Sequence, residues 1–286
     1  MNTPALTVSG LSHAFAMRTV LEDVNLRLDA GRAIALVGPS GCGKTTLLNL
    51  CANLLSVQSG RIDNTFDRPA MLFQQPHLLP WKSVLDNIAL GLKARGMPRA
   101  ERLAAARRMG HALELDDIAI EQFPGQLSGG MQSRAALARA LVLTPDLLLL
   151  DEPFAALDIG LKGQMHQLLL AEMARRPLAV LMITHDVMEA VTLADSVIVM
   201  GGQPGRMRWR LDLPIPPAQR SDEWIYRQTA LLLARPAVRT AFNLPAAAVS
   251  HRAPVEAPGD ADPSAPLFSG AAVAGPITPA KSPTQC

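Results

Sequence analysis

Cysteine is scarce in this sequence, with three residues, Cys42, Cys51 and Cys286, among 286. Their number is odd and their spacing follows no pattern, so we predict free thiols in a reducing compartment and no disulfide framework. Long hydrophobic runs are also missing, the longest being LLLL at 147–150 and LAVLMI at 178–183. Because a membrane-spanning helix needs about 18 or more apolar residues, we expect no direct membrane insertion.

A large excess of one charge is absent too, since 27 Lys and Arg face 25 Asp and Glu. A net charge of +2 provides no electrostatic basis for binding nucleic acid. The sequence does contain 49% hydrophobic and 18% charged residues, which is typical of a folded protein with a sizeable core. The C-terminal end differs, because from about His251 prolines are scattered among Ala, Ser and Gly. We therefore predict a disordered tail over 241–286.

Apolar periodicity predicts strands that alternate with helices. Alternating residues indicate half-buried strands at 5–11 and 24–30, and continuous apolar runs indicate fully buried strands further along. These runs lie at 32–38, 70–74, 146–153, 178–184 and 196–200, and helical spacing appears at 44–55, 160–175 and 186–194. Such alternation favours an α/β fold with a mainly parallel sheet covered on both faces. An Ala-, Arg- and Leu-rich segment at 100–115 indicates a helical insertion between two of the strands.

The segment GPSGCGKTT matches the P-loop pattern and stands between an apolar strand and a helix, the context that this motif requires. Its glycines let backbone N–H groups surround a phosphate, Lys44 can reach the β- and γ-phosphates, and the Thr45 hydroxyl is a candidate Mg²⁺ ligand. Cys42 is interpreted as a small residue that fits the loop. The predicted nucleotide contacts here are Gly38, Pro39, Ser40, Gly41, Cys42, Gly43, Lys44, Thr45 and Thr46.

Two carboxylates follow the LLLL strand. Asp151 ends the strand, where ligands collect in open α/β sheets, and it is a candidate Mg²⁺ ligand. Glu152 comes next and is placed to polarise an attacking water as a general base. The alternative interpretation is that DEP is only an acidic cap at the end of a strand or helix. The P-loop upstream makes this alternative the weaker of the two.

Two further polar residues are predicted at the same edge of the sheet. His185 follows the strand LAVLMIT, and as a neutral imidazole it could donate a hydrogen bond to the γ-phosphate. Gln74 is expected to end the strand AMLFQ and to contact Mg²⁺ or the attacking water through its amide.

A second segment suited to phosphate is LSGGM at 127–131, directly before a strongly helical run. Backbone N–H groups at the start of a helix point outward, and the helix dipole favours negative charge there. The chain therefore has two phosphate-binding segments, the P-loop and the turn formed by Ser128, Gly129 and Gly130.

Six motifs, GPSGCGKTT, LFQQ, LSGGM, LLLLDEP, AALD and ITHD, occur in this order between about Leu6 and Asp212. Their order and spacing resemble those of ABC-transporter ATPase subunits. The resemblance implies a P-loop NTPase with a RecA-like core, an N-terminal antiparallel β region and an inserted α-helical subdomain. The implied domains are an ATPase domain over 1–240, with the helical subdomain at about 76–143, and the tail. The implied activity is ATP hydrolysis, with ATP and Mg²⁺ as cofactors.

The resemblance also implies roles for single residues. Phe15 is similar to the aromatic residue that stacks on adenine, and Asp158 is similar to an aspartate that acts across a dimer interface. Gln74 is similar to the glutamine that couples the γ-phosphate to the helical subdomain. The Ser128–Gly130 turn matches the family signature, so each ATP would lie between the P-loop of one subunit and the signature of another.

The segment HLLPWKSVLDNIALGL at 77–92, Met131 in the signature and PGR at 204–206 resemble the importer group for nitrate, sulfonates and taurine. In that group Trp81 would lie near the permease. The implied partners are a second ATPase subunit in a homodimer, two transmembrane permease subunits and an extracytoplasmic solute-binding protein. The implied location is peripheral, on the cytoplasmic face of the inner membrane. One departure is Ala16, which stands where a glycine is common.

Three other functions are weighed against transport. A soluble ABC ATPase that acts on nucleic acid or in translation would need a coiled-coil insertion or a second cassette, and neither occurs. A P-loop kinase or GTPase gives no reason for LSGGM, and no Asn-Lys-x-Asp guanine motif is present. A binding module without hydrolysis conflicts with the presence of Lys44, Asp151, Glu152 and His185. The sequence does not name the transported compound, and it leaves a homodimer and a heterodimer both open.

Overall fold

The computed structural model describes residues 3–242 and 244–245. The strands are β1 (Ala5–Phe15), β2 (Arg18–Asp29), β3 (Ala33–Val37), β4 (Ser59–Asn64), β5 (Pro69–Leu72), β6 (Leu147–Asp151), β7 (Ala179–Thr184), β8 (Ser196–Gly201) and β9 (Arg206–Asp212). The helices are α1 (Lys44–Cys51), α2 (Val84–Ile88), α3 (Leu90–Ala94), α4 (Arg99–Ala112), α5 (Asp117–Glu121), α6 (Gly129–Leu141), α7 (Ile159–Arg175), α8 (Val187–Leu193), α9 (Asp222–Ala234) and α10 (Pro236–Ala241). Short 3₁₀ turns lie at Pro124–Gln126 and Pro217–Gln219.

The larger sheet has six strands in the order β5-β6-β7-β3-β8-β9. All neighbouring pairs are parallel except β8 and β9, which run antiparallel. Strands β3, β6, β7 and β8 are buried along their whole length, as their continuous apolar runs predict. The predicted α/β fold with a mainly parallel sheet is therefore confirmed.

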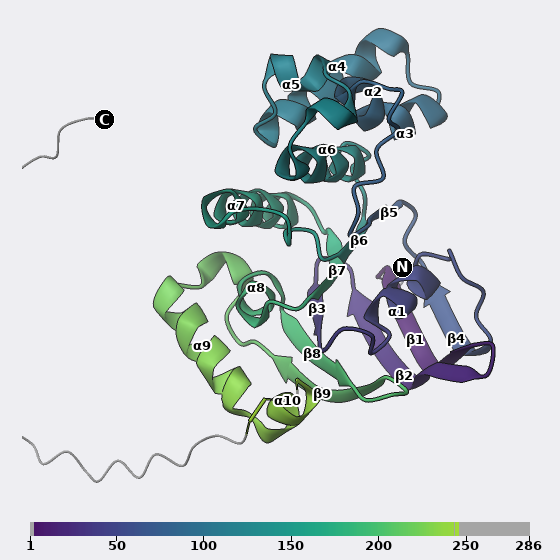
Figure 1. Cartoon of the computed structure of the whole chain (residues 1–286), viewed down its shortest axis with the longest axis vertical. Helices are drawn as coiled ribbons and strands as arrows, with labels where there is room; N and C mark the ends of the chain where they lie inside the picture. The colour runs from purple at the N-terminus through teal and green to yellow at the C-terminus, as the bar shows by residue number, and fades with distance from the viewer. Residues whose placement is uncertain (1–2, 243, 246–286) are drawn as a thin grey trace, which may run out of the picture. The chain divides into compact units, whose positions relative to one another are not determined.

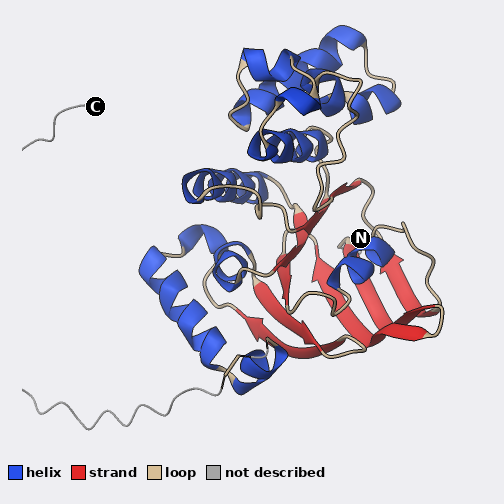
Figure 2. Ribbon diagram, in the orientation of Figure 1, coloured by secondary structure: helices blue, strands red, loops and turns tan. Residues whose placement is uncertain are grey.

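Burial on both faces follows from the alternation of side chains along each parallel strand. In β3, Ile34 and Leu36 join a core that also contains residues of β1, β2 and α1. Ala33, Ala35 and Val37 point the other way and join a core formed with the remaining helices. Helices thus cover both faces of the sheet (Figure 2), and its carboxyl edge stays open for polar side chains.

The smaller sheet is antiparallel, with strand order β2-β1-β4. Strands β1 and β2 pair from Ala5 opposite Asp29 to Phe15 opposite Arg18. One face carries Leu6, Val8 and other buried residues, which pack on the core shared with the larger sheet. The N-terminal antiparallel region is confirmed, and it ends with Phe15 at the tip of the β1–β2 hairpin.

Helices α2–α6 form a group of their own between β5 and β6 (Figure 1). Asn87, fully buried on α2, holds the preceding loop, because its side chain exchanges hydrogen bonds with Leu79 and also donates to the carbonyls of Lys82 and Ser83. The group lies inside the predicted helical subdomain at 76–143, and that boundary stays a prediction.

The structure differs from the sequence prediction at several points. Strand β5 ends at Leu72, so Gln74 lies in the loop beyond the strand and does not end it. The sequence reasoning missed β4, β9, α9 and α10, since β9 alternates between exposed and half-buried residues and has no continuous apolar run. Most of the predicted tail, from residue 246 on, lies outside the described residues. None of the helices in the described part of the chain combines the length and apolarity of a membrane span.

Candidate functional site

The P-loop connects β3 to α1, and close packing explains its glycines. A Cβ atom on Gly38 would lie 2.3 Å from the carbonyl oxygen of Met200. Gly43 has a φ of +95°, and a Cβ there would lie 2.6 Å from a side-chain carbon of Leu21. A larger residue at either position would displace the loop from the sheet, so the fold itself requires glycine at both ends of the motif.

Lys44 is the first residue of α1 and is buried, with 7% of its surface exposed. Its ammonium group donates hydrogen bonds to the carbonyl oxygens of Gly38 and Pro39, both at 2.9 Å. The cation is therefore held inside the loop, beside the N-terminal N–H groups of α1, whose first turn contains no acidic residue. This concentration of positive potential suits a phosphate group.

Thr45 and Asp151 meet across the end of the sheet. The Thr45 hydroxyl donates to Oδ1 of Asp151 at 3.3 Å, and Asp151 is the last residue of β6. Burial raises the pKa of the Asp151 carboxyl, the hydrogen bond from Thr45 opposes this, and the charge of Glu152 adds to the increase. A hydroxyl beside a carboxylate suits Mg²⁺, which is held by one or two protein oxygens together with phosphate oxygens.

The third predicted metal ligand, Gln74, does not join this pair. Its Nε2 lies 3.3 Å from Oε2 of Glu152, and no hydrogen bond among the described residues joins it to Thr45 or Asp151. Within the same described part there is also no group of three or more His, Cys, Asp and Glu residues that could hold a metal ion. Thr45 and Asp151 therefore offer two oxygen ligands for Mg²⁺, and phosphate oxygens of a bound nucleotide would have to supply further ligands.

Glu152 is the centre of the second cluster. The Nδ1 atom of His185 also approaches its Oε2, at 3.3 Å, so one carboxylate oxygen faces both Gln74 and His185. The backbone of Glu152 has a φ of +47°, and its N–H donates to the carbonyl of Ile183 at 2.9 Å. A left-handed conformation costs a non-glycine residue about 1–2 kcal/mol, and such strain concentrates at functional sites.

Phe15 lines a separate cavity of about 340 Å³ next to the P-loop. Its side chain is 49% exposed, and Gly41 forms part of the same wall. The turn between β8 and β9 contributes Gln203 and Pro204, and Oε1 of Gln203 accepts a hydrogen bond from Arg18 at 3.1 Å. A cavity that is lined by an exposed aromatic ring and lies beside a phosphate loop suits a purine ring.

The contribution of the β8–β9 turn was missed by the sequence reasoning, which used PGR only as a mark of the subgroup. Gly205 packs so closely on the P-loop that a Cβ there would lie 1.9 Å from the carbonyl oxygen of Cys42. The glycine in PGR was the available signal, because a glycine in a turn often marks a close backbone approach.

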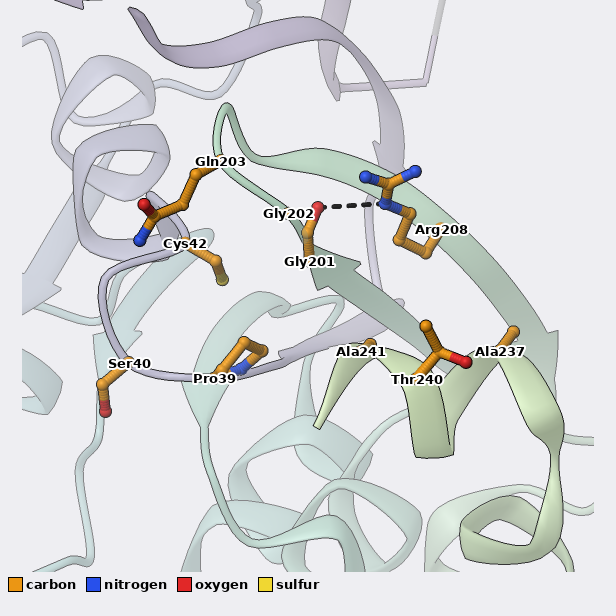
Figure 3. Close-up of a pocket in the computed structure, with 10 residues that line it drawn as sticks. All are labelled: Pro39, Ser40, Cys42, Gly201, Gly202, Gln203, Arg208, Ala237, Thr240 and Ala241. Atoms are coloured by element: carbon orange, nitrogen blue, oxygen red, sulfur yellow. Dashed lines mark hydrogen bonds between the residues drawn. The ribbon is translucent and has the colours of Figure 1, made fainter. Parts of the chain in front are cut away.

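A larger cavity, of about 580 Å³, shares Gln203 with the cavity of Phe15 (Figure 3). Pro39, Ser40 and Cys42 line one wall, and Gly201, Gly202, Gln203 and Arg208 line another, with α10 closing the end (Figure 3). Cys42 is buried, and burial raises the pKa of its thiol. A protonated buried thiol agrees with the interpretation of Cys42 as a small residue that fits the loop.

The Ser128–Gly130 turn lies apart from the clusters just described. Ser128 caps α6, its hydroxyl accepting a hydrogen bond from the N–H of Met131 at 3.3 Å. Among the described residues, none of the hydrogen bonds made by 128–130 reaches the P-loop at 38–46. Asp158 likewise caps a helix, α7, by accepting from the N–H of Leu161 at 3.0 Å. The chain thus keeps its two predicted phosphate-binding segments separate.

The sequence of this chain is similar to those of a known family and of several characterised proteins. The sequence pattern described as "ABC transporter" matches residues 21–155. The chain is 42% identical over 215 residues to the taurine import ATP-binding protein TauB of Escherichia coli O157:H7, covering 73% of this chain and 84% of that protein. Against its counterpart in Pseudomonas aeruginosa the identity is 42% over 226 residues, covering 75% and 85%.

The fold is also similar to a solved structure, a dimeric post-hydrolysis state of the ATP-binding cassette MJ0796 bound to ADP and Pi. The TM-score is 0.69 at 28% sequence identity, covering 73% of this chain and 99% of the other. That structure combines the nucleotide and the dimer in one assembly.

Proposed function

Because this chain belongs to the family of ABC transporter ATP-binding proteins, we propose that its P-loop face is one half of a composite ATP site, which the Ser128–Gly130 turn of a second copy completes. The chain is an ATPase and drives the import of a small solute. The observation that carries the assignment of the site is the approach of both Gln74 and His185 to Oε2 of Glu152.

Binding of ATP uses the features on the P-loop side. The Phe15 ring stacks on adenine in the cavity that it shares with Gln203, and the P-loop N–H groups surround the phosphates. Lys44 exchanges its contacts with the carbonyls of Gly38 and Pro39 for phosphate oxygens. The contacts of Lys44 with these two carbonyls already hold its ammonium inside the loop, so little ordering of this side chain is required on binding.

Thr45 and Asp151 are the residues that would hold Mg²⁺, which when bound neutralises charge between the β- and γ-phosphates. In our assignment Gln74 contacts the attacking water and Glu152, and only Thr45 and Asp151 bind the Mg²⁺ ion. Because Asp151 is buried and its pKa is raised, its carboxylate is poorly stabilised by the protein alone. A cation at this position offsets that cost.

Hydrolysis is assigned to the cluster around Glu152. Its carboxylate accepts a proton from the attacking water, and Gln74 orients that water through its amide. His185 donates a hydrogen bond from its imidazole ring to the γ-phosphate. The strained backbone at Glu152 and its hydrogen bond to Ile183 hold the carboxylate at the edge of the sheet.

The dimer explains why one chain has two phosphate-binding segments that do not meet. In the proposed assembly the N-terminus of α6 faces the γ-phosphate held by the other copy, with Asp158 at the same interface. Closure and opening of the dimer move α2–α6, and the loop with Trp81 transmits this motion to two transmembrane permease subunits. The chain then acts on the cytoplasmic face of the inner membrane, in a system with an extracytoplasmic solute-binding protein.

The solute is proposed to be taurine or a related small sulfonate, since the relatives described above are named for taurine import. Deleting the gene in the source organism and measuring uptake of labelled taurine, an alkanesulfonate and nitrate tests this assignment. Loss of taurine or sulfonate uptake is the expected result. Undiminished uptake of both sulfonates, with loss of another solute, would overturn the solute assignment and leave the ATPase assignment standing.

The ATPase site is tested with Glu152→Gln in the purified full chain. We expect steady-state hydrolysis to fall by about 100-fold or more, because the general base is removed. ATP binding should persist, and the closed dimer should accumulate with ATP in size-exclusion chromatography. Glu101→Gln, an exposed carboxylate on α4, is the matched control. Hydrolysis by Glu152→Gln at the wild-type rate would refute the assignment.

A further inference from the structure

An ionic cluster between α7 and α8 has no place in the ATP site described above. The ammonium of Lys162, on the first turn of α7, lies 2.8 Å from Oδ2 of Asp186 and 3.4 Å from Oε1 of Glu189. The same Glu189 oxygen lies 3.4 Å from Nε2 of His166, one turn further along α7. The side chain of Glu189 is only 3% exposed and those of Lys162 and Asp186 are 24% and 31% exposed, so the cluster lies largely beneath the surface.

The cluster joins two segments of the proposed ATP site. Asp186 directly follows His185, and its carboxylate caps α8 by accepting from the N–H groups of Met188 and Glu189 at 3.0 and 3.1 Å. At the other end, Lys162 lies in the first turn of α7, where its N–H donates the first backbone hydrogen bond of the helix to the carbonyl of the capping residue Asp158 at 2.8 Å. Lys162 therefore links the segment that contains Asp158 to the segment that contains His185.

A third segment touches the cluster through His166. Its ring packs edge-on against Phe154, with 4.9 Å between centroids. Phe154 lies two residues after Glu152 and is 1% exposed. The chain turns that follow β6 and β7, and the start of α7, thus all contact the same group of four side chains.

The pKa shifts of Lys162 and Asp186 have the directions expected for an attraction between their charges. Burial acts to lower the pKa of Lys162, but the hydrogen bond with Asp186 and the charges of both carboxylates outweigh it and raise the pKa. For Asp186 burial acts in the opposite sense, and the hydrogen bond from Lys162 outweighs it and lowers the pKa. The shifts favour the charged forms of Lys162 and Asp186, and the Lys162 ammonium is the shared neighbour of the Asp186 and Glu189 carboxyl groups.

Such a cluster is a weak source of stability, because the desolvation of buried charges offsets most of their attraction. Its directional contacts do restrict how two helices can sit against each other. This points to a role in positioning, since an apolar contact between α7 and α8 would stabilise the fold equally well and leave the helices freer to shift.

We propose that Lys162 is a positioning residue for hydrolysis, which sets the His185 segment against the Asp158 segment through Asp186 and Glu189. It does so without touching the nucleotide. The inference rests on the proposed ATP site, because the positions that it controls are those of His185 and Asp158. A small shift of a catalytic group is enough to slow turnover by one to two orders of magnitude, about 10- to 100-fold.

The test compares Lys162→Met and Lys162→Arg in the full chain, with kcat and KM for ATP measured separately. We expect Lys162→Met to lower kcat about 10-fold or more with KM within about twofold of wild type. Lys162→Arg should recover most of the loss, because it restores the charge. Arg175→Met is the matched control on the same helix, since the Arg175 side chain is 63% exposed and pairs with Glu172, outside the cluster.

Two measurements keep the outcome decisive. If Lys162→Met does not fold, the isosteric Glu189→Gln takes its place, and a reduced kcat at unchanged KM is again the expected result. If either variant melts at a lower temperature than wild type and still turns over at the wild-type kcat, the cluster serves stability alone and the proposal is overturned. Glu152→Gln in the same series separates the two proposals, because its loss of hydrolysis tests the ATP site independently of Lys162.

Discussion

The Nδ1 atom of His185 lies 3.3 Å from Oε2 of Glu152, although the two residues belong to different strand-to-helix connections. Parallel pairing of β6 with β7 explains this contact. Asp151 is in register with Ile183, so the segments that follow the two strands leave the sheet at the same edge. In the proposed site, the two side chains would therefore act on the same γ-phosphate and attacking water.

His185→Ala tests this pairing in the purified chain. We expect kcat to fall by about 100-fold, since a hydrogen-bond donor to the γ-phosphate and a neighbour of the base are lost together. ATP binding, measured by equilibrium titration, should change little. His111→Ala is the control, since His111 lies on α4 at the surface, with its Nε2 3.2 Å from Oδ1 of Asp117. A His185→Ala variant with unaltered kcat would exclude His185 from catalysis.

The composite site makes a prediction about mixtures of two inactive variants. Lys44→Ala damages the P-loop side and should weaken ATP binding itself, whereas Ser128→Arg damages the signature side and should leave the first capture of ATP intact. A mixed dimer has one site with both intact halves, so mixing equal amounts should restore up to about a quarter of wild-type hydrolysis. No recovery in chromatographically verified mixed dimers would argue for a site contained in one chain.

Burial of Asp151 predicts that this carboxylate, although required for hydrolysis, lowers the stability of the nucleotide-free protein at neutral pH. Its folded-state pKa is raised above the unfolded value, so the stability gained from its proton is complete below the unfolded pKa and is lost as the pH rises through the raised pKa. Asp151→Asn cannot ionise. We expect the nucleotide-free variant to melt at a higher temperature than wild type near pH 7, with the difference shrinking toward about pH 4.

Thermal melts across this pH range measure the effect, and Asp67→Asn, at an exposed position, is the control. The same Asp151→Asn variant should lose Mg²⁺-dependent hydrolysis. A variant that is less stable than wild type at neutral pH would show that the carboxylate contributes favourably to the nucleotide-free fold.

Ala16 offers a prediction about stability alone. It joins β1 to β2 with a φ of +51°, a left-handed conformation that glycine adopts without strain. Ala16→Gly should therefore raise the free energy of unfolding by about 1 kcal/mol, or the melting temperature by about 2–4 °C. Ala52→Gly, where the backbone is right-handed at φ −79°, should have the opposite sign. Equal effects of the two substitutions would exclude strain as the cause.

Trp81 is predicted to take part in docking on the permease. Its side chain is 70% exposed in the loop that Asn87 anchors, and large exposed aromatic residues often dominate binding energy. Trp81→Ala should leave basal ATPase activity of the purified chain intact and weaken its binding to permease-containing membranes by about 10-fold or more. Tyr226→Ala, 64% exposed on α9, is the control. Unchanged membrane binding would remove Trp81 from the interface.

Much of the fold could be predicted because its signals are local. Continuous apolar runs mark strands buried on two faces, and this predicted β3, β6, β7 and β8. Strand β9 and helix α9 were missed, since β9 is half-exposed and α9 buries only Ile225 and Leu232. Neither has a periodic pattern strong enough to stand out without its packing partners.

The sequence by itself determined the chemistry that is available: a P-loop with its lysine and threonine, two carboxylates behind an apolar strand, and a second segment suited to phosphate. These depend on neighbours in the chain, which a sequence displays directly. Only the tertiary structure decided that Gln74 approaches Glu152 and not the Thr45–Asp151 pair, and that Lys162 links α7 to α8. Strand register and helix packing determine such contacts, because they bring together residues that are far apart in the chain.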